Sequence, residues 1–147
     1  MAGKWDEVHG KENNFARNNR SREAGSYFCR NCPVPVTFLG WEVGYDVITG
    51  ANLAQDDILY QALCDHGSSR GRSSWDPMLV LLAIIGDEKK AGYDVVRGLA
   101  AVDPSTGENC FCASAEGLHV YVVKNQDNDY YQDTIHERIQ SLQNEKA

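Results

Sequence analysis

Residues 75–86 read Trp-Asp-Pro-Met-Leu-Val-Leu-Leu-Ala-Ile-Ile-Gly, and this stretch decides which kind of fold the chain can form. Asp76 is a suitable N-cap, Pro77 suits the first helical position, and Gly86 suits the position just after a helix. A helix that is apolar all round is normally buried. The stretch therefore predicts a helix in the middle of a layered fold.

Strands and helices are expected to alternate on both sides of this helix. The expected strands are 34–39, 93–96 and 119–123. The expected helices are 21–31, with Ser21 as N-cap, then 51–63, with Leu53, Ile58, Leu59, Ala62 and Leu63 on its apolar face, and 129–143. The polar residues 1–19 are expected to form a loop, and residues 67–74 a flexible connector. Such alternation predicts an α/β fold with a mainly parallel sheet and flanking helices.

The length and composition are those of one ordinary globular domain, residues 1–147. Hydrophobic residues make up 42% of the chain and charged residues 24%. The apolar run 78–85 is far shorter than the roughly 20 residues that cross a bilayer, and no secretory signal opens the chain. A net charge of −7 argues against a broad nucleic-acid-binding surface. We therefore expect neither a membrane nor a nucleic acid as partner.

The chain has five cysteines, Cys29, Cys32, Cys64, Cys110 and Cys112. Because the number is odd and no secretory signal precedes them, we expect free thiols in a reducing, cytoplasmic compartment. The alternative is a zinc site made by the pairs 29/32 and 110/112. Their spacings are poor for zinc, which favours thiols that pack as small apolar groups.

Four polar or aromatic residues are candidates for a site, and each also has a purely structural interpretation. Asp76 is either a helix cap or a carboxylate that binds a metal or substrate. Trp75 is either a core residue or a ring that stacks on a flat heterocycle. Glu12 and Asn14 lie in a polar segment that is also typical of a solvated turn. No histidine pair has metal-ligand spacing, and no nucleophile elbow or phosphate-binding loop is present.

Several motifs in order resemble the inosine–uridine-preferring nucleoside hydrolase family. They are Pro-Val-Pro-Val-Thr-Phe-Leu-Gly-Trp-Glu-Val-Gly at 33–44, Val-Ile-Thr-Gly at 47–50, Arg-Ser-Ser-Trp-Asp-Pro at 72–77, Asp-Pro-Ser-Thr-Gly at 103–107, and the aromatic segment 119–124. The likeness covers roughly residues 10–140 and is to the later part of the family's domain.

The resemblance implies hydrolysis of the N-glycosidic bond of a ribonucleoside to a base and ribose. A Ca²⁺ ion in the family binds the ribose hydroxyls and the attacking water, and an Asp is the general base. Glu12 and Asn14 match the family's ribose-contacting E-x-N motif. Asp76 matches a late calcium ligand, and Trp75 resembles the tryptophan that stacks on the base in the purine-preferring branch. The resemblance thus implies that Glu12, Asn14, Trp75 and Asp76 lie near one another.

The chain departs from the family in one respect. The family's opening motif D-x-D-x-x-x-D-D, which supplies most calcium ligands and the general base, is absent from this sequence. We therefore expect an incomplete domain that corresponds to the C-terminal half, with an incomplete calcium site and no catalytic residue of its own. The expected partners are a small nucleoside and either a second copy or a chain that supplies the missing half. The alternative is a non-catalytic remnant that binds a partner protein.

Overall fold

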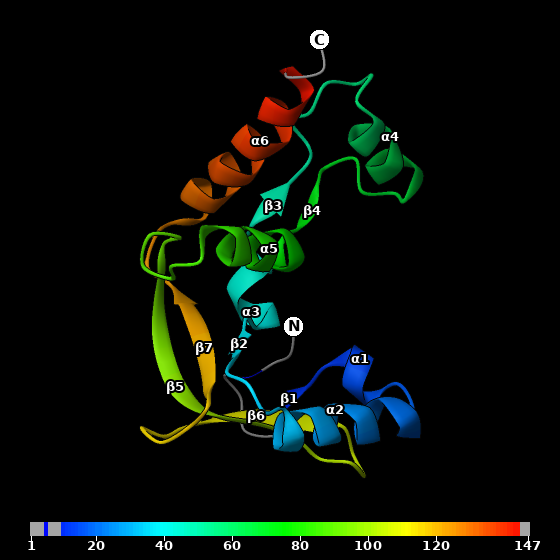
Figure 1. The fold of residues 1–147 in the computed structure, drawn as a ribbon. Coiled ribbons are helices and arrows are strands. Elements are labelled where there is room, and N and C mark those ends of the chain that lie inside the picture. The colour runs from blue at the N-terminus through cyan, green and yellow to red at the C-terminus, as the bar shows by residue number, and fades with distance from the viewer. Residues whose placement is uncertain (1–4, 6–9, 145–147) are drawn as a thin grey trace.

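The structure, a computed structural model, describes Trp5 and residues 10–144 (Figure 1). Within them the helices are α1 (Asn13–Ala16), α2 (Asn19–Asn31), α3 (Trp41–Gly44), α4 (Ile58–Asp65), α5 (Trp75–Ile85) and α6 (Asn128–Asn144). The strands are β1 (Gly10–Lys11), β2 (Val36–Phe38), β3 (Ile48–Thr49), β4 (Arg72–Ser73), β5 (Tyr93–Val102), β6 (Glu108–Ala113) and β7 (His119–Lys124). The chain is therefore a mixed α/β protein. None of the helices in this described part is long and apolar enough to cross a membrane.

The expected mainly parallel sheet is wrong. In the described residues, five strands form a sheet in the order β1-β6-β5-β7-β2, and β3 and β4 form a separate antiparallel pair. Within the larger sheet only the pairing of β2 with β7 is parallel, whereas β1–β6, β6–β5 and β5–β7 are antiparallel.

The physical reason lies in two short connections. A tight turn after β5 is held by Asp103, whose Oδ1 accepts from the amides of Ser105 and Thr106 at 2.7 and 2.8 Å. A second turn follows β6, where the Gly117 amide donates to the Ser114 carbonyl. Connections this short join antiparallel neighbours, because a parallel crossover needs a dozen or more residues. Sequence reasoning missed β6 and took only the first part of β5 as strand.

The helix boundaries differ from the expected ones at their N-termini. Helix α2 begins at Asn19, and its cap is Asn18 rather than Ser21, since Asn18 Oδ1 accepts from the Ser21 amide at 2.9 Å. Helix α4 covers only the last part of the expected helix 51–63, because Asp57 caps it by accepting from the Leu59 amide. Two other expectations were too simple. The polar segment 1–19 contains β1 and α1, and residues 67–74 contain β4.

Helix α5 is confirmed, but its surroundings are not those expected. Gly86 ends it in the left-handed conformation, with φ +68° and its amide donating to the Leu82 carbonyl. Met78 and Leu82 are buried in the core. Val80 is 57% exposed and Ile84 74% exposed, so the opposite face of this apolar helix lies in solvent.

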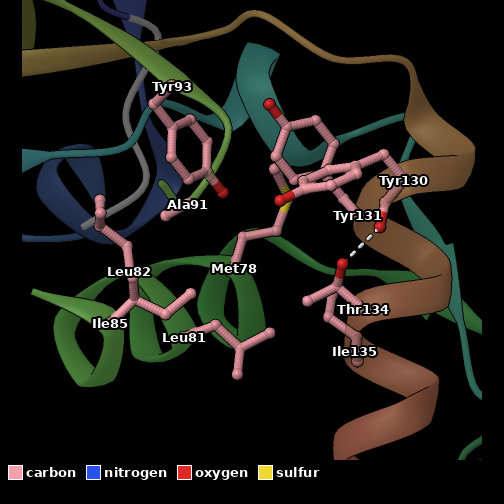
Figure 2. A pocket seen from close by; sticks show the side chains of 10 residues that line it. All are labelled: Met78, Leu81, Leu82, Ile85, Ala91, Tyr93, Tyr130, Tyr131, Thr134 and Ile135. Carbon is pink, nitrogen blue, oxygen red and sulfur yellow. Dashed lines mark hydrogen bonds between the residues drawn. The ribbon is translucent and has the colours of Figure 1, made fainter. Parts of the chain in front are cut away.

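Helix α6 closes the core over α5 (Figure 2). Tyr93, Tyr130 and Tyr131 stand over the buried side of α5, and the Tyr131 hydroxyl donates to the Gly92 carbonyl. The space they enclose with Met78 is only about 20 Å³, which is room for about one water molecule. This region is thus packed interior and not a ligand site.

Candidate functional site

A cavity of about 270 Å³ lies where α5 begins. Its walls come from β3, β4, α4, α5 and α6, which are far apart in the sequence. Polar groups come from the β3 and β4 ends and from the start of α5, and apolar groups come from α4 and α6. The lining residues are Thr49, Gly50, Leu59, Leu63, Arg72, Ser73, Ser74, Trp75, Asp76, Pro77, Ile135 and Ile139.

Trp75 and Asp76 line this cavity side by side. Trp75 is partly buried against the core, and its backbone is held close to α3, since a Cβ on Gly44 would lie 2.5 Å from Trp75 Cα. Asp76 is exposed in the first turn of the helix. The positive end of the helix dipole stabilises a carboxylate there.

The expected capping role of Asp76 is wrong. The N-cap of α5 is Ser74, Trp75 is the first helical residue, and Pro77 is the third rather than the first. The backbone therefore starts the helix two residues earlier than the proline signal indicated. As a consequence, Asp76 is the second helical residue, two positions after the N-cap.

Glu12 and Asn14 contact each other at the start of α1. Glu12 caps this short helix: its Oε2 accepts from the Asn14 amide at 2.7 Å and its Oε1 from Asn14 Nδ2 at 3.1 Å. The Glu12 amide donates to Oδ1 of the buried Asn109 at 3.2 Å, which fixes this turn to β6. The carboxylate is thus already used in capping, a role the sequence did not suggest.

The structure brings the four predicted residues together as two pairs. Trp75 and Asp76 share the cavity at α5, and Glu12 and Asn14 share the cap at α1. Neither Glu12 nor Asn14 is among the residues that line the cavity. In Figure 1, α1 lies beside α2, whereas β4 and α4 lie on the other side of α5. A common site for all four stays a prediction.

The calcium site of the family is not assembled by the residues that the structure describes. Among them, no group of three or more His, Cys, Asp or Glu side chains is placed to hold a metal ion. Asp76 supplies at most two oxygens, whereas Ca²⁺ takes six to eight. This part of the chain therefore offers one carboxylate for such an ion and not a complete coordination shell.

Sequence reasoning missed three polar residues around the cavity. Arg72 lines it and donates from Nη1 to His66 Nε2 at 2.8 Å. His136, on α6, accepts from the Gly50 amide at its Nε2 at 3.1 Å. Arg72 lies in the motif at 72–77. The contacts of Arg72 with His66 and of Gly50 with His136 could not be predicted, because the spacing of these residues in the sequence does not indicate contact.

The cysteines are free thiols in the structure, as expected. Cys29 is buried on α2, and burial together with the neighbouring Cys110 raises the pKa of its thiol to about 11. Burial and the adjacent Cys112 raise the pKa of Cys110 as well. These thiols therefore stay protonated near neutral pH, which suits a packing role better than a nucleophilic one.

Comparisons with protein-family models, with curated proteins and with solved structures found no match for this chain.

Proposed function

We propose that this chain is a nucleoside hydrolase-like protein that binds a purine nucleoside at the cavity where α5 begins. The observation that carries the proposal is the placement of Trp75 and Asp76, in direct succession, on the wall of a cavity of about 270 Å³. A cavity near the lower end of the usual range for small-molecule sites suits a compact ligand. The family resemblance then supplies the ligand class.

Trp75 is the residue that selects the base. An indole offers a broad π-face, and a purine has more area to stack on it than a pyrimidine. Such stacking contributes about 1–3 kcal/mol per base, which corresponds to roughly 5- to 150-fold in binding. The indole N–H donates a hydrogen bond but has no proton to give to a leaving base.

Asp76 is the residue that faces the sugar. A carboxylate accepts hydrogen bonds from ribose hydroxyls, and that of Asp76 is exposed in the first turn of α5. In the intact family such a carboxylate also binds Ca²⁺, which polarises the attacking water. Because the described residues hold no complete calcium site, we assign nucleoside binding to this chain and hydrolysis only to a complex that adds the Asp-rich motif.

Calorimetric titration of the chain with inosine and with uridine tests the binding step. We expect inosine to bind at least tenfold more tightly, and Trp75→Ala to remove that difference. Trp41→Phe is the matched control for Trp75→Phe. Trp41 is also partly buried, but its ring packs on Tyr45. Equal affinity for the two nucleosides in the unaltered chain would rule out base stacking by Trp75.

A second experiment tests hydrolysis. The chain is mixed with a polypeptide that carries D-x-D-x-x-x-D-D from a nucleoside hydrolase, with and without added Ca²⁺. We expect release of hypoxanthine from inosine only in the complete mixture, and loss of that release with Asp76→Asn. Hydrolysis of inosine by the chain alone would contradict the assignment of binding to this chain and of hydrolysis to the complex.

A second candidate function is that of a non-catalytic, partner-binding subunit. The specific observation that favours it is the exposed face of α5, where Val80 and Ile84 lie in solvent although the helix has only one charged residue. Contiguous apolar patches on a protein surface mark interaction sites. Copurification with an intact nucleoside hydrolase, abolished by Val80→Glu but not by Trp75→Ala, would favour this function.

A further inference from the structure

Helix α4 differs from α2, α5 and α6 because it contributes no buried side chain to the core. None of its side chains is buried, and Ile58 is 84% exposed. In Figure 1 it stands apart from the sheet, at the end of the excursion that residues 50–71 make between β3 and β4. The pairing of Thr49 with Arg72 fixes both ends of that excursion.

Both ends of α4 are capped by the excursion itself. Asp57 Oδ1 accepts from the Leu59 amide at the start. At the end, the Gly67 amide donates to the Cys64 carbonyl at 2.9 Å and the Ser68 amide to the Leu63 carbonyl at 2.7 Å. This is the Schellman pattern, and Gly67 has the positive φ of +81° that it requires. Because both of its ends are capped, α4 is expected to form and open as one unit.

Two contacts connect α4 to the cavity. Leu59 and Leu63 line the cavity together with Trp75. Beyond the helix, Arg72 Nη1 lies 2.8 Å from His66 Nε2 and 3.1 Å from His66 Nδ1, and Nδ1 also lies 3.0 Å from Ser68 Oγ. One neutral tautomer satisfies both bonds, with Nδ1–H donating to Ser68 and Nε2 accepting from Arg72.

We propose that the hydrogen bond from Arg72 to His66 is a latch that holds α4 across the Trp75 cavity. With the latch closed, Leu59 and Leu63 complete the apolar wall. With the latch open, the segment between the buried Leu53 and Arg72 loses this tether, and α4 opens by local unfolding. Arg72 is therefore a positioning residue. The consequence for ligand affinity rests on the proposed function, whereas the latch itself does not.

Hydrogen–deuterium exchange of the full chain tests the latch without any ligand. We expect Arg72→Ala and His66→Ala each to raise the exchange rate of the α4 amides by about tenfold, the factor that an ordinary net hydrogen bond corresponds to. The double variant should exchange no faster than either single one, because both remove the same bond. The amides of α6 serve as an internal reference, and Arg70→Ala, at an exposed neighbouring arginine, as the matched control.

Calorimetry with inosine as the probe separates this proposal from the proposed function. If inosine binds, His66→Ala, at a residue outside the cavity lining, should weaken it by about tenfold while Arg70→Ala leaves it unchanged. If inosine does not bind the unaltered chain, the proposed function fails, and the exchange experiment still decides on the latch. Unchanged α4 exchange in both Arg72→Ala and His66→Ala, with the chain folded by circular dichroism, would overturn the latch.

Discussion

The hydroxyl oxygens of Thr49 and Ser74 lie 2.6 Å apart in the interior, and this hydrogen bond joins the end of β3 to the N-cap of α5. Ser74 Oγ also donates to the Arg72 carbonyl at 3.1 Å, so the Thr49 hydroxyl donates to Ser74. The bond sets where α5 begins relative to the β3–β4 pair. It thereby positions Trp75 at the cavity.

Loss of this buried bond should destabilise the fold. Ser74→Ala leaves the Thr49 hydroxyl buried without its acceptor, which costs about 1–3 kcal/mol. Urea denaturation followed by circular dichroism measures the change in the free energy of unfolding. Ser69→Ala, at an exposed serine of the same excursion, is the control and should change it by less than about 0.5 kcal/mol. Equal effects of the two substitutions would contradict a structural role for the Thr49–Ser74 bond.

Stability should fall in mild acid because of His119. This residue is only 3% exposed, its Nδ1 accepts from the Ala100 amide at 2.8 Å, and burial lowers the pKa of its imidazole. The unfolded chain therefore takes up the proton first. The contribution of His119 is complete above about pH 6.5 and is lost as the pH falls from there through the lowered pKa of the folded state.

Denaturation at a series of pH values between 5 and 8 measures this effect. His119→Asn keeps a side-chain acceptor but does not titrate, so its free energy of unfolding should fall less steeply in acid than that of the unaltered chain. A His119→Asn variant that keeps the full pH dependence would show that other groups cause it.

The two faces of α5 should respond very differently to truncation. Met78 is 1% exposed and lies under the tyrosines of β5 and α6, so Met78→Ala leaves a cavity and costs about 2–5 kcal/mol. Val80→Ala, at a side chain that is 57% exposed, should cost less than about 1 kcal/mol. Thermal and urea denaturation of the two variants give the comparison. A large loss from Val80→Ala in the isolated chain would mean that this face is covered in solution.

Thiol labelling should follow burial and pKa. Cys112 is exposed and should react first with iodoacetamide at pH 8. Cys29 is buried, and a thiol with a pKa of about 11 is almost wholly protonated at that pH, so it should react last and only after unfolding. Mass spectrometry of timed samples, with and without urea, gives the order. Early modification of Cys29 in the folded chain would contradict its packing against the core.

The sequence by itself determined the elements whose signals are local. Gly86 ends α5 because only a residue that tolerates positive φ suits that position. The β-branched and aromatic run at 119–123 forms β7, and the long helix near the C-terminus begins within one residue of the expected position. The Trp-Asp pair could also be singled out from its neighbours alone. The prediction of a base-stacking tryptophan and a calcium-ligand aspartate at this pair also came from the sequence alone.

Tertiary structure alone decided how these elements combine. Antiparallel pairing of β5, β6 and β7 goes with two tight turns, the first of which is held by the amides of Ser105 and Thr106, which donate to the Asp103 carboxylate. The cavity at Trp75 needs leucines of α4 and isoleucines of α6, which no sequence spacing connects. The two-position shift of Asp76 into the helix followed from Ser74 bonding to Thr49. Contacts between residues far apart in the chain override local preferences, because packing and buried hydrogen bonds outweigh the smaller energies of capping and propensity.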